Sequence, residues 1–149
     1  MKRILSLLLV CTVSLFTFVG FASQALALPK TISLQNVATG LYLDSDSNKK
    51  VYTKERNDGS YQKWNVSGTD IISLQNAATG FYLDSDSNKK VYTKERNNGS
   101  YQKWNVSGTD PGIISLQNVA TGFYLDSNSK KNVYTKEGNG GSYQKWWVR

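Results

Sequence analysis

The sequence predicts an all-β domain in which three similar units close around a three-fold axis. A segment of roughly 40 residues occurs three times in succession, over residues 31–70, 71–112 and 113–149. Each copy has four short runs of strand-forming residues, and outside residues 1–27 no window has a helical period. Neither end of the array resembles the capping unit that an open solenoid needs. Three four-stranded units therefore favour a closed barrel or sandwich.

The strands are predicted from the local pattern of the first copy. Apolar and polar side chains alternate in residues 31–36 (TISLQN), and they alternate again in residues 41–45 (LYLDS) after a Thr-Gly turn. Residues 51–55 (VYTKE) are β-branched and aromatic, and residues 61–66 (YQKWNV) are predicted to form the fourth strand. Before that strand, Asn57-Asp58-Gly59 is a tight-turn signal, because Asn and Gly tolerate positive φ.

A Gln-x-Trp triplet occurs once in each copy, at Gln62, Gln102 and Gln144. A tryptophan is costly to expose, and its predicted place in a strand favours a core role over a sugar-stacking platform. The glutamine two residues earlier should satisfy backbone groups at the strand ends. Trp147 occurs only once, and no role is predicted for it. We expect one shared core, formed by Leu34, Leu43, Val51, Trp64 and their counterparts.

Residues 1–27 are predicted to be a secretory signal peptide. Lys2 and Arg3 precede a mostly apolar run over residues 4–21, and Ala25-Leu26-Ala27 fits a cleavage signal. An uncleaved membrane anchor is the alternative, because the run approaches spanning length. Cleavage would leave residues 28–149 as a single secreted domain, extracellular or periplasmic. That domain has no cysteine, so its core must hold it without disulfides.

Basic residues outnumber acidic ones by 18 to 11 in the full chain. They come in small sets that recur from copy to copy, such as Lys49-Lys50, which is typical of a solvated face. We therefore predict no nucleic-acid partner and, after signal cleavage, no stable membrane insertion.

Four residues recur at the same places in every copy and form the candidate site. A carboxylate can accept hydrogen bonds from two neighbouring sugar hydroxyls, and an asparagine amide both donates and accepts. A tyrosine offers a flat face and a hydroxyl. One Asp, one Asn and two Tyr therefore suit a pyranose. The candidate sugar-binding residues are Asp44, Tyr52, Asn57, Tyr61, Asp84, Tyr92, Asn97, Tyr101, Asp126, Tyr134, Asn139 and Tyr143.

Three Gln-x-Trp triplets in a three-repeat all-β chain resemble those of the ricin-type β-trefoil lectins. The LDS, VYT and YQxW segments and the Asn-Gly-Gly turn resemble most closely the small three-repeat lectins of the actinohivin type. The resemblance covers residues 28–149 and implies a β-trefoil without enzymatic activity or cofactor. It also implies three equivalent pockets for terminal α1,2-linked mannose of high-mannose glycans, formed by the candidate residues above.

The chain departs from that family pattern after VYT. The family has an apolar Leu and then Pro, whereas this chain has Lys54-Glu55, Lys94-Glu95 and Lys136-Glu137. We therefore expect a charged, less rigid lip at each pocket, which leaves galactose or another sugar as an alternative ligand. The Asn-Gly-Gly turn is intact only at Asn139-Gly140-Gly141. Three weak pockets on one body predict capture of branched glycans by avidity.

Other functions fit the sequence less well. Asp44 and Asp46 could be imagined as glycosidase carboxylates, but Asp46 corresponds to Asn128 in the third copy and the chain has no His, so we predict no enzyme. Asp44-x-Asp46-x-Asn48 imitates a calcium loop, yet Lys49 stands where such a loop needs glycine, so we predict no metal. A trefoil that binds protein or inhibits a protease remains the alternative.

Overall fold

The computed structural model describes residues 27–108 and 112–149. The predicted signal peptide lies outside the described residues, apart from Ala27. The described part consists of short strands, single 3₁₀ turns and connecting loops, and none of its helical turns is long and apolar enough to cross a membrane. The prediction of an all-β protein built from three four-stranded units is confirmed.

The strands follow one another in the same order in each unit. The first unit holds β1 (Thr31–Ile32), β2 (Leu34–Asn36), β3 (Tyr42–Ser45), β4 (Val51–Lys54) and β5 (Trp64–Gly68). The second holds β6 (Ile71–Asn76), β7 (Tyr82–Ser85), β8 (Val91–Lys94) and β9 (Trp104–Ser107). The third holds β10 (Ile113–Asn118), β11 (Tyr124–Ser127), β12 (Val133–Lys136) and β13 (Trp146–Val148).

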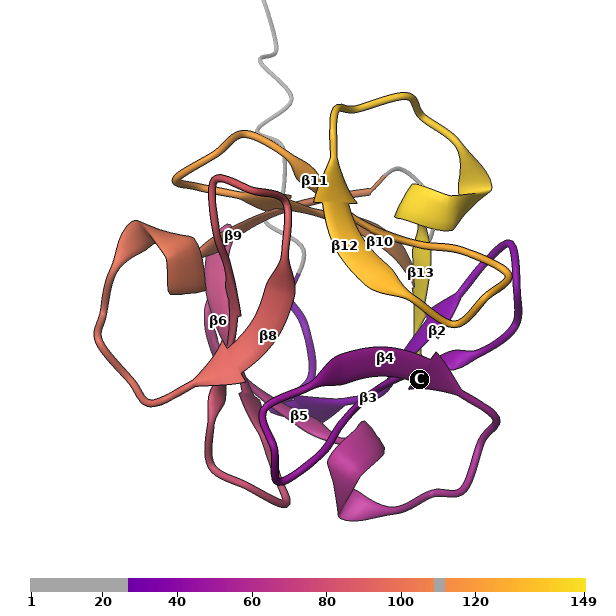
Figure 1. The fold of residues 1–149 in the computed structure, drawn as a ribbon, viewed down its shortest axis with the longest axis horizontal. Coiled ribbons are helices and arrows are strands. Elements are labelled where there is room, and N and C mark those ends of the chain that lie inside the picture. The colour runs from indigo at the N-terminus through magenta and orange to yellow at the C-terminus, as the bar shows by residue number, and fades with distance from the viewer. Residues whose placement is uncertain (1–26, 109–111) are drawn as a thin grey trace, which may run out of the picture.

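The first and last strands of the three units form a closed ring. Neighbouring strands follow the order β1-β5-β6-β9-β10-β13-β2, and each pair is antiparallel. Because β1 and β2 are halves of one strand separated at Ser33, this order closes on itself. The remaining strands form the hairpins β3–β4, β7–β8 and β11–β12, arranged around a common centre (Figure 1).

The three hairpins are joined to one another around the centre by backbone hydrogen bonds. A threonine N–H of each hairpin donates to a lysine carbonyl in the turn of another unit: Thr53 to Lys131 at 3.0 Å, Thr93 to Lys49 at 2.9 Å and Thr135 to Lys89 at 2.9 Å. Each unit therefore depends on a neighbour for its closure, as a three-fold object requires.

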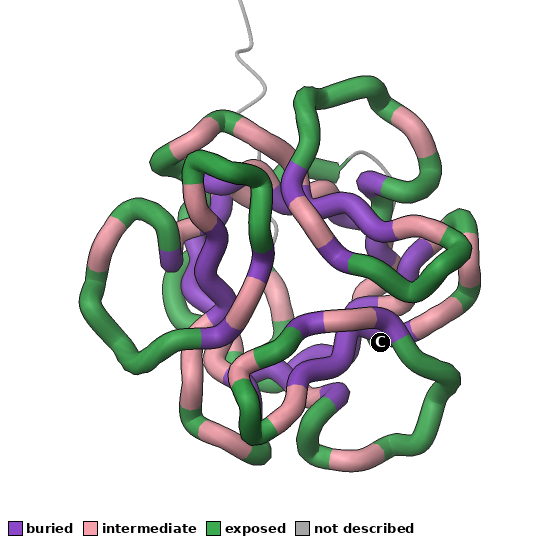
Figure 2. Tube along the Cα trace, viewed as in Figure 1, coloured by how far each residue is buried: buried purple, intermediate pink, exposed green. Residues whose placement is uncertain are grey.

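One core fills the centre of the molecule, and the loops around it are exposed (Figure 2). Leu34, Leu43 and Trp64 have no exposed surface, and Val51 is 5% exposed, so the predicted core residues are buried. The Trp64 indole N–H donates to the Leu43 carbonyl at 3.2 Å, and the same bond recurs in the other units. The tryptophan therefore ties the end of each unit to its own hairpin as well as packing.

The predicted fourth strand begins later than expected. Tyr61 and Gln62 belong to a 3₁₀ turn, η1 (Ser60–Gln62), and the strand starts at Trp64. The second and third units have the equivalent turns η2 (Ser100–Gln102) and η3 (Ser142–Gln144). The Gln-x-Trp triplet therefore spans the end of a helical turn and the start of a strand, and the interpretation that it sits within a strand is wrong for the glutamine.

Candidate functional site

The candidate aspartate and the first candidate tyrosine of each copy face each other across a hairpin. Asp44 pairs in register with Tyr52, Asp84 with Tyr92, and Asp126 with Tyr134. Directly opposed residues of an antiparallel pair project from the same face of the sheet. The next pair, Leu43 and Thr53, is buried on the core side. The alternation along these strands therefore places Asp and Tyr together on the outer face of every hairpin.

Each candidate aspartate is almost covered, with 2% of its surface exposed. Burial raises the pKa of Asp44 and Asp84 above the usual 3.8, and the adjacent glutamine side chain and lysine charge oppose that rise. Asp84 Oδ2 and Asp126 Oδ1 are buried and have no hydrogen-bond partner among the described residues. A buried acceptor without a donor costs free energy, so these carboxylates are prepared to accept a hydrogen bond from a ligand.

The glutamine of each Gln-x-Trp triplet connects the parts of the site. Gln62 Nε2 donates to the Glu55 carbonyl at 2.9 Å, and its Oε1 accepts from the Asn57 N–H at 3.1 Å. It thus satisfies backbone groups as predicted, although these belong to the loop after β4. In the third copy Gln144 Nε2 also donates to Asp126 Oδ2 at 3.0 Å. Sequence reasoning missed this contact. The available signal was that Asp and Gln stand the same distance apart in every copy.

The candidate asparagine shapes a turn. Asn57 Oδ1 accepts the Gly59 N–H at 2.9 Å, and the equivalent bonds of Asn97 and Asn139 are 2.8 Å long. The positive φ of this turn falls on its middle residue, at 55° in Asp58, and not on the flanking Asn or Gly. The side-chain oxygen is therefore occupied, which leaves the amide N–H groups of Asn57 as the part that can meet a ligand.

The two candidate tyrosines differ in exposure. Tyr61, on the 3₁₀ turn, is 42% exposed, whereas Tyr52 is half-buried on β4. Burial and the Asp44 charge raise the pKa of Tyr52 above 10.0. The structure thus brings Asp44 and Tyr52 together, packs the 3₁₀ turn of Tyr61 against β3, and joins Asn57 to that turn through Gln62.

A turn from another unit lies beside the first tyrosine of every site. Tyr52 forms an isolated bridge with Asn132, Tyr92 with Lys50, and Tyr134 with Lys90. Clefts of about 570 and 530 Å³ occur here, the first lined by Tyr92 and Lys50 and the second by Tyr52 and Asn132. The four candidate residues repeat, but the residue bridged to the first tyrosine does not: it is a lysine at two sites and an asparagine at the third.

The lip after VYT carries the expected charges, and it is tied to the adjacent unit. Lys131 Nζ lies 2.7 Å from Glu55 Oε1, and Lys49–Glu95 and Lys89–Glu137 repeat this ion pair at 2.7 and 2.8 Å. Lys49 and Lys89 also lie 5.0 Å from the ring centroids of Phe81 and Phe123. These contacts argue against the expected loss of rigidity. Each ion pair is about half exposed, so solvent screens it and it adds little to stability.

The second aspartate of the hairpin has a structural role. Asp46 Oδ1 accepts from the backbone N–H groups of Asn48 and Lys50 at 2.9 and 3.0 Å, and so closes the turn. Asn128 does the same in the third copy, which explains why Asp and Asn interchange there. Among the described residues, no group of three or more His, Cys, Asp or Glu side chains is placed to hold a metal ion.

A family model for the ricin-type β-trefoil lectin domain matches residues 30–146. No curated protein matches the chain. The designed three-fold symmetric protein ThreeFoil is similar in structure, with a TM-score of 0.73 and 20% identity over 80% of this chain and 98% of its own.

Two larger proteins contain a similar structure as one part of their chains. A mosquitocidal holotoxin matches with a TM-score of 0.75 and 17% identity, over 83% of this chain and 17% of its own. An exo-β-1,3-galactanase from Clostridium thermocellum matches with a TM-score of 0.71 and 18% identity, over 82% of this chain and 31% of its own. At these identities the structural likeness speaks for the fold alone, and the predicted β-trefoil is confirmed.

Proposed function

The chain belongs to the ricin-type β-trefoil lectin domain family, which implies carbohydrate binding, and on this premise we propose that it is a secreted lectin with three sites for terminal mannose of high-mannose glycans. The observation that carries the proposal is the register pair of aspartate and tyrosine on the outer face of each hairpin, present three times. The resemblance of these segments to three-repeat lectins of the actinohivin type supports mannose as the sugar.

In the proposed complex the aspartate accepts hydrogen bonds from sugar hydroxyls. The buried and unpartnered oxygens of Asp84 and Asp126 supply acceptors for this purpose. Because only 2% of each aspartate is exposed, the side chains around it must shift when the sugar enters. The more exposed Tyr61 then covers one face of the ring, and the Asn57 amide donates from the rim. Tyr52, opposite Asp44 on the hairpin, supplies a hydroxyl that can donate.

Avidity supplies the strength that one site lacks. A neutral sugar exchanges its hydrogen bonds with water for protein ones, so the net gain at each site is modest. Sites on the three hairpins surround one axis of a rigid body (Figure 1). Binding a second branch of the same glycan is then intramolecular and can raise the affinity by about 10² to 10⁴. The proposed activity is therefore multivalent capture, with no chemical step.

Secretion and the absence of catalysis are parts of the same proposal. Lys2, Arg3 and the apolar run before Ala27 support export through a signal peptide. The engagement of Asp46 in closing a turn leaves Asp44 without a second carboxylate partner on its own hairpin, which argues against a glycosidase pair.

A glycan array with residues 28–149 tests this function, with free mannose and galactose as competitors. Selective binding to high-mannose glycans that mannose abolishes is the expected result. Binding abolished by galactose would keep a lectin but change its sugar, and no binding to any glycan would refute the proposal and favour a protein ligand.

Matched variants connect the array result to the site. The triple variant Asp44→Asn, Asp84→Asn and Asp126→Asn should lose binding while a thermal melt shows that it folds. The double variant Asp46→Asn and Asp86→Asn is the control, because it makes the same chemical change two residues away, where the third copy already has Asn128. It should bind as the unaltered protein does.

A further inference from the structure

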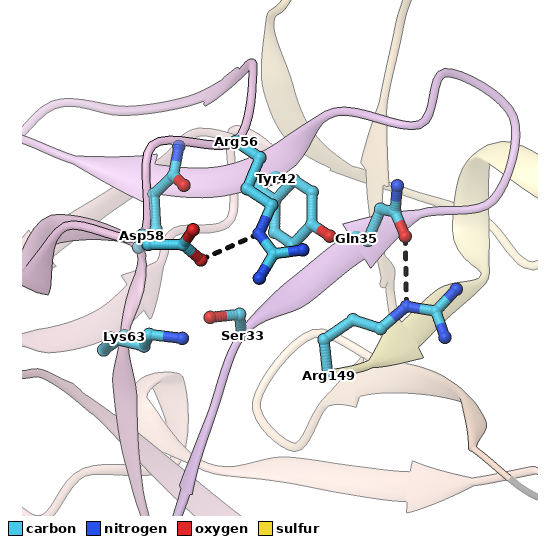
Figure 3. Close-up of a pocket in the computed structure, with 8 residues that line it drawn as sticks. Ser33, Gln35, Tyr42, Arg56, Asp58, Lys63 and Arg149 are labelled. Atoms are coloured by element: carbon cyan, nitrogen blue, oxygen red, sulfur yellow. Dashed lines mark hydrogen bonds and ion pairs between the residues drawn. The ribbon is translucent and has the colours of Figure 1, made fainter.

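The flank of the first unit has a cleft of about 520 Å³ that contains none of the candidate sugar-binding residues. It lies between the loop after β4 and the strands β2 and β13, and Figure 3 shows the side chains that line it. Its volume is within the range of about 300–1,000 Å³ that is usual for small-molecule sites. Three of its lining residues are cationic (Arg56, Lys63 and Arg149), and one is anionic (Asp58).

The arginines at this cleft are held in place and keep donors free. Arg56 Nε contacts Asp58 Oδ1 at 2.7 Å, which leaves the two terminal nitrogens of the guanidinium for a ligand. Arg149 Nε donates to Gln35 Oε1 at 3.1 Å, and its guanidinium lies 4.8 Å from the centre of the Trp147 ring. Figure 3 shows the Arg56 and Lys63 side chains reaching toward Ser33, with Arg149 along the opposite side.

Ser33 adds an unused hydroxyl to these cations. The equivalent Ser73 and Ser115 donate their hydroxyls to the carbonyls of Gln102 and Gln144, both at 3.0 Å. Ser33 Oγ makes no hydrogen bond within the described residues, although the residue is only 3% exposed, and it lines the cleft. Its oxygen opens onto the cleft, so the hydroxyl can donate to a ligand there.

The other two units do not reproduce this combination. The third unit has Gly138 and Gly140 in place of Arg56 and Asp58. Its equivalent cleft, of about 360 Å³, is lined by Ser107 at the place that Arg149 takes in the first unit. In the second unit Arg96 lies 5.8 Å from the Tyr82 ring centroid, and Ser73 is bonded to the backbone. The second unit keeps Arg96 and Lys103 at the places of Arg56 and Lys63. Its Ser73 pairs with Ser67, however, whereas Ser33 pairs with Arg149, so Arg149 is the cation that distinguishes the first unit.

We propose that the flank cleft of the first unit binds an oxyanion, the sulfate or carboxylate group of an acidic saccharide, through Arg56, Lys63 and the Ser33 hydroxyl. Arginine and lysine make strong charge-assisted hydrogen bonds to oxyanions, and Arg149 adds positive charge at the edge. Asp58 weakens this field. The saccharide part of the proposal rests on the proposed lectin function, whereas the oxyanion site does not.

Two-dimensional NMR of the folded chain tests the site with sodium sulfate as the probe and sodium chloride of equal ionic strength as the reference. Sulfate should cause saturable shifts at the Ser33 amide and the Arg56 Nε–H, and not at their counterparts Ser73 and Arg96. Shifts that grow linearly, or equally in all units, would mean general ion screening and would overturn the proposal.

Paired variants separate the site from general charge effects. Arg56→Gln should weaken sulfate binding by about fivefold or more, since it removes charge-assisted hydrogen bonds, whereas Arg96→Gln makes the same change in net charge and should have no effect. Asp58→Asn should tighten binding, because it removes the one negative charge and the second unit already has Asn98 there. Equal effects of the two arginine variants would refute the assignment.

Acidic sugars identify the source of the anion. Glucuronate and glucose 6-sulfate are titrated against glucose, and at least one of the two should shift Ser33 at lower concentration than inorganic sulfate does. Acidic sugars that bind no better than sulfate would overturn the saccharide part. The same spectra report on Tyr52, Tyr92 and Tyr134 when mannose is added, so failure of the mannose sites is read separately.

Discussion

Replacing Asp84 with asparagine is expected to stabilise the fold at neutral pH and to remove one sugar site. The Asp84 carboxylate is 2% exposed, and its Oδ2 has no hydrogen-bond partner among the described residues. Its pKa is raised above 3.8, chiefly by burial, while Gln102 and Lys94 oppose the rise. Asparagine has nearly the same shape and no charge, so the variant avoids the cost of burying an ionised group.

The sign and size of the effect follow from that environment. An acid whose folded pKa exceeds its unfolded pKa favours the folded state below the unfolded value, and this contribution is lost as pH rises through the folded value. The ionised Asp84 therefore costs stability at pH 7. Removing it should raise the free energy of unfolding by about 1 kcal/mol, which is about 3–5 °C in Tm for a domain of this size. At pH 3 the gain should largely vanish.

Asp126→Asn is the matched comparison, because Gln144 already donates to Asp126 Oδ2 at 3.0 Å. Asparagine would weaken that charge-assisted hydrogen bond, so its gain should be smaller than that of Asp84→Asn. Urea unfolding at pH 7 and pH 3 measures both variants. A loss of stability in Asp84→Asn at pH 7, or the same gain at both pH values, would refute the reasoning. Sugar binding at that site should fall by about tenfold or more, since a charged hydrogen bond is lost.

Three further variants probe the support of the sites. Gln102→Ala should lower the free energy of unfolding by about 2–3 kcal/mol, because it removes two hydrogen bonds to backbone groups. Urea unfolding measures this loss, and a value below about 1 kcal/mol would contradict the prediction. Glu95→Gln breaks the exposed ion pair with Lys49 and should lower the urea midpoint only slightly, an effect that disappears in 1 M salt. Trp104→Phe leaves the Leu83 carbonyl without its hydrogen-bond donor and creates a cavity, so the free energy of unfolding should fall by about 2–4 kcal/mol. Calorimetry measures this, and an unchanged stability would contradict the core role.

Repetition and alternation made the fold predictable. The period-two pattern places the Leu43 side chain in the core and the Asp44 side chain on the opposite face of the hairpin, although Asp44 is buried there as well. The same alternation places Asp44 beside Tyr52, so part of the candidate site could be predicted from local order alone. Three copies of one unit then required a closed arrangement.

Contacts between units could not be read from a single copy. The ion pair of Lys131 with Glu55 and the bridge of Asn132 to Tyr52 join residues far apart in the chain, and no local pattern marks them. The 3₁₀ turn at Tyr61 was missed because strand and turn share the same short aromatic run. The 2% exposure of Asp44 was also not predicted, because the 3₁₀ turn that packs against β3 was not expected.

Isothermal titration of residues 28–149 with α1,2-linked mannobiose tests the central claim most directly, because it counts the sites. Three ligands per chain are predicted, and two should remain in the Asp84→Asn variant. A stoichiometry of three that Asp84→Asn leaves unchanged would place the sugar elsewhere, and no heat of binding at millimolar ligand would contradict the proposed mannose sites.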